Sequence, residues 1–203
     1  MTPEEVYTPV AEFYNSVASE YLERVQHEAH SAFPTIVPKI LGEHGINQSD
    51  YNVIDLACGA GFLKTYTKFN SYIGVDVAEE MLGEASNNGY DMLIQNDIST
   101  VLAGLGDAVV DGAFLMSAAY FLSPHVLSET IIQMRRVANK FICFTFDGVT
   151  PALIKEYKNN GGIDVYNHIG FPLPEGIERF TASGWTADTG EEIQVEYCFG
   201  LLQ

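Results

Sequence analysis

The chain has 203 residues, with 10 lysines and arginines against 27 aspartates and glutamates, and its formal net charge at pH 7 is −17. This length suits one domain with a single sizeable core, and 47% hydrophobic against 18% charged residues excludes an intrinsically disordered chain. An acidic field of this size repels phosphate backbones, so we expect a small, neutral or cationic partner and no nucleic acid.

The sequence also bears on where the protein works. No apolar run approaches the length of a membrane span, and no basic-then-apolar start marks a signal peptide. The three cysteines, Cys58, Cys143 and Cys198, are scattered and lack the spacing of zinc ligands. We therefore expect a cytoplasmic protein with reduced thiols, no membrane association and no metal, while its oligomeric state stays open.

The N-terminal part of the chain reads as two helices. Phe13, Tyr14 and Tyr21 belong to an aromatic stripe at helical spacing, which predicts a helix over residues 4–29. A second helix is predicted from Phe33 to His44. The aromatic stripe either packs on a sheet or faces a ligand, and the sequence favours neither.

The stretch from Val53 to Leu63 is an apolar strand, a turn of small residues and the start of a helix. Further strand-like runs end at Asp76 and Asp97, and Asp55, Asp76 and Asp97 are spaced 21 positions apart. One strand with its return helix needs about this length, so the three carboxylates should lie at the carboxyl ends of three parallel strands. Open α/β sheets bind ligands there. One such aspartate alone would be read as a helix cap, but three in phase with a glycine loop favour a ligand site.

The glycine loop limits which ligand can bind. A dinucleotide fingerprint needs a third glycine three residues after Gly61, where this chain has Lys64. The Gly-Lys-Ser/Thr of a phosphate-binding P-loop is missing from the sequence as well. The loop therefore suits a nucleoside ligand that has no pyrophosphate.

Past the three aspartates, Ser123 and Pro124 open a helix predicted to run through Asn139. After this helix the sequence predicts a buried fifth strand, a further helix, a short helix and two final strand-like segments, in that order. Their predicted bounds are Phe141–Phe146 ending at Asp147, Pro151–Lys158, Gly176–Ser183, Trp185–Thr186 and Ile193–Phe199.

The histidines are candidates for proton transfer. His168 lies in an aromatic, turn-rich stretch, where it is either a general base for an acceptor or an ordinary loop residue. His27 and His30 share one helical face with Glu23, a spacing that permits a metal or a base but is more typical of a solvated polar face. His125, in the first turn of its helix, is placed near the mouth of the expected pocket.

The run Asp55-Leu-Ala57-Cys-Gly59-Ala-Gly61 resembles motif I of the class I S-adenosylmethionine (SAM) dependent methyltransferases, with Ala57 where glycine is commonest. Asp76 is similar to the family acid that binds both ribose hydroxyls, and Asp97-Ile98 to the pair beside the adenine. The resemblance implies that SAM is the cofactor and S-adenosylhomocysteine (SAH) the product. The residues it assigns to the cofactor are Tyr14, Tyr21, Asp55, Ala57, Gly59, Gly61, Asp76, Val77, Met81, Asp97, Ile98, Ser117 and Ala118. The segment Leu115–Phe121 is similar to the one after strand four that lines the methionine side of SAM. Tyr120, Tyr166 and His125 are assigned to the acceptor, and His168 to the base.

The resemblance implies an α/β, Rossmann-like, doubly wound sheet of seven strands, mostly parallel, with a C-terminal antiparallel hairpin and an N-terminal helical lid. Residues 1–203 should form one domain, in which 1–45 are the helical cover, 50–147 the SAM-binding core and 148–203 the acceptor side with the edge hairpin. The implied activity is transfer of a methyl group from SAM to an oxygen, nitrogen or carbon of a small molecule by direct displacement. The alternatives are a SAM-binding or regulatory subunit that does not methylate and, less favoured because of Lys64, an NAD-dependent oxidoreductase.

Overall fold

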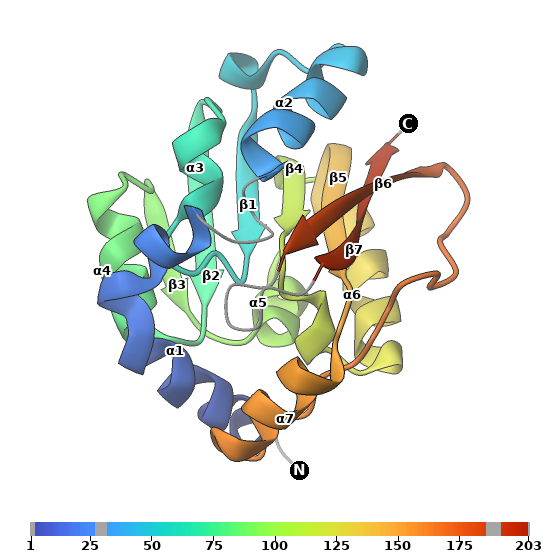
Figure 1. Cartoon of the computed structure of the whole chain (residues 1–203). Helices are drawn as coiled ribbons and strands as arrows, with labels where there is room; N and C mark the ends of the chain where they lie inside the picture. Colours follow the sequence, from blue (N-terminus) through green and yellow to red (C-terminus); the bar gives the residue numbers. More distant parts are fainter. Residues whose placement is uncertain (1–2, 27–31, 186–191, 203) are drawn as a thin grey trace.

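A computed structural model describes residues 3–26, 32–185 and 192–202 of the protein (Figure 1). Its centre is one seven-stranded sheet with the strand order β3-β2-β1-β4-β5-β7-β6. The strands are β1 (Asn52–Leu56), β2 (Ser71–Asp76), β3 (Met92–Gln95), β4 (Val110–Leu115), β5 (Ala138–Asp147), β6 (Ile177–Trp185) and β7 (Glu192–Leu201).

The first five strands run parallel, and β7 is antiparallel to both β5 and β6. The chain winds outward from β1 to β3, then crosses back to β4 on the other side of β1. The carboxyl ends of β1 and β4 are therefore the switch point at which doubly wound sheets bind ligands. The expected seven-stranded sheet with its antiparallel hairpin is confirmed.

The helices are α1 (Pro3–Gln26), α2 (Phe33–Glu43), α3 (Phe62–Tyr66), α4 (Glu79–Asn87), α5 (Ile98–Gly104), α6 (Pro124–Val137) and α7 (Pro151–Asn159), with 3₁₀ turns η2 (Gln48–Asp50) and η3 (Ala119–Phe121). Side-chain caps explain where several of them begin. The Ser123 and Thr150 hydroxyls accept the amide hydrogens of Val126 and Leu153, and proline follows each cap.

Two apolar clusters cover the two faces of the sheet. Side chains from α2, α3 and α4, such as Leu41 and Leu63, pack on one face around Phe114 and Phe141. Side chains from α5 and α6 pack on the other face, around residues such as Phe144. Because both faces are covered, the central strands are almost wholly buried, as the apolar runs in the sequence require.

The predicted short helix over Gly176–Ser183 is wrong, because Gly176 lies in a turn and the residues that follow it belong to β6. The strand pairs with β7 from Ile177 opposite Gly200 to Trp185 opposite Glu192. Its signal depends on this partner strand, since short polar-apolar alternation at a sheet edge resembles a helical turn when it is read alone. The α6 helix also ends at Val137, two residues early, because β5 already begins at Ala138.

No helix in the described part of the chain is both long and apolar enough to cross a membrane. The three cysteines all lie among the described residues and are free, buried thiols, as expected.

Candidate functional site

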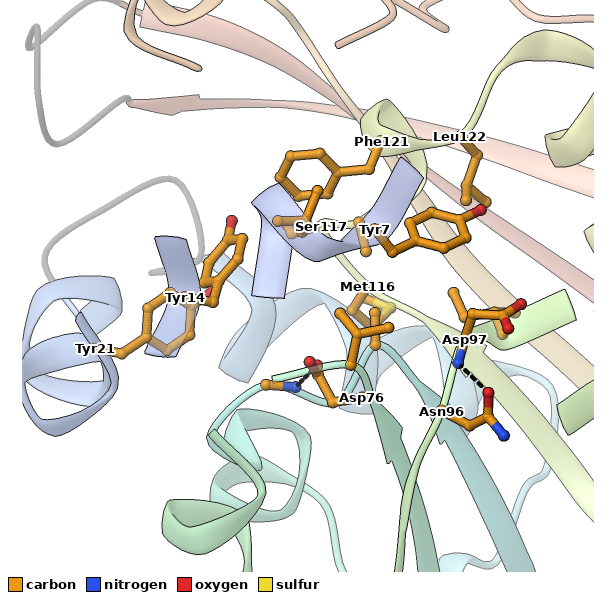
Figure 2. A pocket seen from close by; sticks show the side chains of 16 residues that line it. Tyr7, Tyr14, Tyr21, Asp76, Asn96, Asp97, Met116, Ser117, Phe121 and Leu122 are labelled. Atoms are coloured by element: carbon orange, nitrogen blue, oxygen red, sulfur yellow. Dashed lines mark hydrogen bonds between the residues drawn. The ribbon is translucent and has the colours of Figure 1, made fainter. Parts of the chain in front are cut away.

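A pocket lies between the carboxyl ends of the parallel strands and the helix α1. In Figure 1 this helix passes below the tips of the strands, and Figure 2 shows the pocket from close by. Five segments contribute to its wall. They are Tyr7, Val10, Tyr14 and Tyr21 of α1; Ala57 and Gly59 after β1; Asp76 and Val77 at the end of β2; Asn96, Asp97 and Ile98 after β3; and Met116, Ser117, Ala118, Phe121 and Leu122 after β4.

The loop after β1 has an uncommon backbone. Ala57, Gly59 and Gly61 all have positive φ, at 54°, 51° and 83°. A Cβ added to Gly59 would meet only a Tyr21 ring carbon, at 3.6 Å, so the backbone of Gly59 is open to the pocket. The same addition at Gly61 would come within 2.9 Å of the Tyr90 ring and 3.1 Å of the Ala85 backbone. Gly59 therefore allows approach by a ligand, whereas Gly61 allows the loop to pack against α4.

Asp76 connects the glycine loop to β2. Its carboxylate accepts the amide hydrogen of Gly59 at 2.8 Å and that of Ala78 at 2.9 Å (Figure 2). Burial raises the pKa of Asp76, and the amide hydrogen bonds oppose that shift. Each carboxylate oxygen has two lone pairs, so Asp76 can hold the loop and still accept hydrogen bonds from a ligand diol.

Asp97 is the N-cap of α5, where its Oδ1 accepts the amide hydrogen of Thr100 at 2.9 Å. It also lines the pocket beside Asn96, whose side-chain oxygen accepts the Asp97 amide hydrogen. Asp97 therefore caps a helix and lines the pocket with the same side chain.

Three of the residues assigned to the cofactor lie outside the pocket wall: Asp55, Gly61 and Met81. Asp55 is buried, and the Tyr90 hydroxyl donates a 2.5 Å hydrogen bond to it. Burial raises the pKa of Asp55 to about 7; the nearby Asp76 adds to the rise, and the Tyr90 hydrogen bond opposes it. Met81 is fully buried in a small cluster with Ala60 and Ala78. Asp55 and Met81 therefore support the glycine loop on the side that faces away from the pocket.

The segment after β4 closes the other side of the pocket. Ser117 holds a φ of 49°, and its amide donates a 2.8 Å hydrogen bond to the Thr145 hydroxyl of β5. A serine in this left-handed region is strained, and such strain is concentrated at functional sites. Ser117 and Ala118, both assigned to the cofactor, are thereby fixed in the wall beside Met116.

Three tyrosine hydroxyls meet where α1 passes over η3 and α7. The Tyr14 hydroxyl lies 3.0 Å from that of Tyr157 and 3.4 Å from that of Tyr120. Burial, followed by the neighbouring phenols, raises the pKa of Tyr14 well above its usual value, so the cluster is neutral. Tyr14 thus lines the pocket and also ties α1 to η3 and α7.

The remaining acceptor-side candidates do not line the pocket. His168 is buried, and its Nε2–H donates to the Leu122 carbonyl at 2.9 Å, so the histidine holds the end of η3 in place. Burial lowers its pKa, with backbone hydrogen bonds opposing the shift. Tyr166 donates its amide hydrogen to the Tyr120 carbonyl, and His125 is exposed on α6. These positions favour a structural role for His168 over proton abstraction in the pocket.

His27 and His30 lie outside the described residues, so the helical face that they share with Glu23 is not part of the described structure. Within the described residues, no group of three or more histidines, cysteines, aspartates or glutamates is arranged to hold a metal ion.

Four wall residues are not predicted from the sequence: Tyr7, Val10, Asn96 and Leu122. Tyr7 and Val10 lie seven and four positions before Tyr14 and could have been found by extending the helical stripe. Leu122 had no such signal, because its approach to the pocket depends on the η3 turn.

Solved structures share this fold. Magnesium protoporphyrin IX methyltransferase from Synechocystis PCC 6803, solved with bound SAH, matches with a TM-score of 0.64 and 19% identity over 97% of this chain and 99% of that one. A complex of the Haloferax volcanii Trm112 methyltransferase activator and a putative methyltransferase matches at 0.63 and 15%, over 93% and 96%. A putative RNA methyltransferase from Pyrococcus horikoshii matches at 0.57 and 15%, over 84% of each chain.

The chain thus has the Rossmann-like fold of the SAM-dependent methyltransferases. Residues 54–140 match a family model described as a methyltransferase domain, and the resemblance inferred from the glycine loop and the spaced aspartates is confirmed. None of the curated proteins compared with the sequence matches it.

Proposed function

We propose that the protein is a SAM-dependent methyltransferase that acts on a small-molecule acceptor. The observation that carries the proposal is the joint position of Gly59, Asp76 and Asp97 on one pocket wall, opposite the tyrosines of α1. The methyltransferase fold and the family match support the reaction class. Within the single domain, we propose that residues 1–45 cover the pocket, 50–147 bind SAM and 148–203 form the acceptor side and edge hairpin.

The residues of the wall fit the parts of SAM. Asp76 has free lone pairs for the ribose hydroxyls, and Asp97 with Ile98 would hold the adenine. Ser117 and Ala118 would lie along the methionine side. SAM supplies an electrophilic methyl group on a sulfonium cation, which carboxylates and aromatic faces stabilise.

The protein's own contribution to the reaction is then positioning and exclusion of water. Holding an acceptor in line with the methyl group lowers the barrier by several kcal/mol through proximity alone. The aromatic wall of α1 keeps solvent from the reacting atoms. A general base is not obligatory in this scheme, which agrees with the buried, hydrogen-bonded position of His168.

A small acceptor is favoured over a nucleic acid by the charge of the chain. The net charge of −17 opposes a phosphate backbone, and two of the five segments that line the pocket carry aspartates. We propose cytoplasmic methylation of a neutral or cationic metabolite.

Calorimetric titration with SAM, SAH and NAD tests the proposal directly. We expect SAM and SAH to bind in the micromolar range and NAD not to bind. Tight binding of NAD in preference to SAM would identify an oxidoreductase instead. Incubation of a metabolite extract with isotope-labelled SAM, read by mass spectrometry, separates an enzyme from a SAM-binding subunit, because only the enzyme transfers the label.

A matched pair of glycine variants tests whether the pocket is the binding site. Gly59→Val places a branched side chain at the open backbone beside Tyr21 and should abolish SAH binding. Gly45→Val is the control, because Gly45 also has positive φ, at 71°, and a Cβ there meets nothing within 4 Å. Equal SAH affinity in the two folded variants would show that the loop after β1 is only a turn.

A further inference from the structure

Asp147, the last residue of β5, lies at the carboxyl edge of the sheet beside the strand that leads to Ser117. It is buried, with 8% of its surface accessible, and its Oδ1 has no hydrogen-bond partner among the described residues. Asp55 is buried and Asp76 is half-buried, yet each accepts a hydrogen bond from the protein. Asp147 is therefore the carboxylate in this region that the fold itself leaves unsatisfied.

Two hydroxyl groups near Asp147 are also buried without a hydrogen-bond partner among the described residues. The Ser117 hydroxyl is close enough to lower the pKa of Asp147, but it does not form an aligned hydrogen bond with any described group. The Tyr197 hydroxyl of β7, whose pKa rises through burial and then through the charge of Asp147, is likewise buried without a described partner. Buried polar groups are normally paired, and each unpaired one costs about 1–3 kcal/mol, so such a group in a native site calls for a partner that the protein itself does not supply.

Positive charge is missing from the protein side of this site. No salt bridge joins Asp147 to a described lysine, arginine or histidine. The side chains around it are neutral, namely Ser117 and Tyr197 together with Tyr120, whose pKa the charge of Asp147 helps to raise. Tyr120 in turn packs against Phe121 of the pocket wall, with ring centroids 4.4 Å apart.

We propose that Asp147, which adjoins Ser117 of the pocket wall and has Tyr120 nearby, binds the acceptor and selects a small organic amine in its cationic form. A carboxylate that lacks a countercharge, with aromatic faces nearby, is the arrangement that attracts an ammonium group. An alcohol would satisfy the hydrogen bond but not the charge, and a carboxylic acid would be repelled. This inference rests on the proposed function, since it places the amine beside the SAM wall at Ser117.

The ionisation of Asp147 agrees with this role. Burial raises the pKa of Asp147 to about 6, and the Ser117 hydroxyl opposes the shift. The side chain is therefore ionised near neutral pH and loses its charge below about pH 6. The phenols of Tyr120 and Tyr197 stay neutral throughout this range, because burial raises both of their pKa values.

The test uses the full chain saturated with SAH and titrated calorimetrically at pH 7.5. The probes are benzylamine and phenethylamine, the matched alcohols, and 3-phenylpropanoate. We expect at least one amine to bind tenfold or more tightly than its alcohol, and the carboxylate not to bind. If SAH binds and no amine is preferred, the inference fails and the proposed function stands. If SAH itself does not bind, the proposed function fails, and this inference with it.

Asp147→Asn keeps the shape of the side chain and removes its charge. It should weaken amine binding roughly tenfold or more while SAH affinity stays within about twofold. Asp107→Asn is the charge-matched control, because Asp107 is exposed and lies before β4, at the opposite edge of the sheet. Unchanged amine affinity in a folded Asp147→Asn protein would overturn the inference.

Wild-type protein gives an independent readout should Asp147→Asn not fold. With SAH kept saturating, amine affinity should rise as the pH increases from 5 to 7.5, because Asp147 gains its charge while the amine keeps its own. An affinity that is flat over this range would equally overturn the inference.

Discussion

At the scale of single residues, three aspartates with the same spacing have three different environments. Asp76 holds the loop and faces the pocket, Asp97 caps a helix and faces the pocket, and Asp55 is turned inward to Tyr90. The sequence predicts that all three lie at strand ends, which is correct. It cannot predict which way each side chain turns, since that depends on partners such as Tyr90, 35 positions away.

His168→Ala separates a structural histidine from a general base. The Leu122 carbonyl would lose its donor in a buried place, so we expect a loss of about 1–3 kcal/mol in the free energy of unfolding, with weaker activity because η3 shifts. His168→Gln should recover both, because its amide can still donate to that carbonyl. A base would show the reverse pattern, in which the glutamine and alanine variants are equally inactive at unchanged stability.

At the scale of elements, local signals identify the parallel strands and their helices, because capping residues and apolar runs lie within single segments. Of the strand β6 only its last residue, Trp185, is predicted as strand-like, because the evidence for the rest lies in β7; Thr186 is outside the described residues. For α1 the sequence leaves two interpretations open, packing on the sheet or facing a ligand. Tyr7, Val10, Tyr14 and Tyr21 line the pocket, and Val10 also packs with Tyr157 of α7.

The helix α1 should become more protected when ligand binds. Four of its residues line the pocket, and the Asn15 side chain accepts the Glu80 amide hydrogen of α4 at 3.0 Å, so a ligand adds contacts to a helix that is already docked. We expect amide hydrogen exchange over residues 7–21 to slow with SAH at about 100 times its Kd, by up to about 2.7 kcal/mol of protection. Peptides from residues 192–201 are the control. If both regions slow equally, the ligand stabilises the whole fold and α1 does not act as a lid.

At the scale of the whole molecule, the net negative charge and the ionisation of the buried carboxyls both lower the stability of the fold as the pH rises. Burial raises the pKa of Asp55 to about 7 and that of Asp147 to about 6, and it raises that of Asp76 as well. An acid whose folded pKa exceeds its unfolded value near 4 keeps its proton longer in the folded state. Its stabilising effect is full below about pH 4 and is lost as the pH rises through the folded pKa.

The free energy of unfolding should therefore fall between pH 5 and pH 8, by about 1.4 kcal/mol for each pH unit over which one such proton is retained. Urea denaturation at constant ionic strength measures this fall. Asp55→Asn should flatten it, most clearly between pH 5 and pH 7, because asparagine does not titrate. Stability that increases from pH 5 to pH 8 would show that these carboxyls are ionised throughout.

The tyrosine contacts that hold α1 in place also determine when, during folding, the pocket can be completed. Tyr14 meets Tyr120 and Tyr157 across 106 and 143 positions of sequence, which are long loops to close during folding. During synthesis α1 leaves the ribosome early, but the contact of its Tyr14 with Tyr157 cannot form until α7 has been made. The strands β1 to β4, which carry the glycine loop and the switch point, are made much sooner, whereas β6 and β7 follow α7. We therefore expect the β1–β4 part of the sheet to form before the tyrosine cluster that completes the aromatic wall of the pocket.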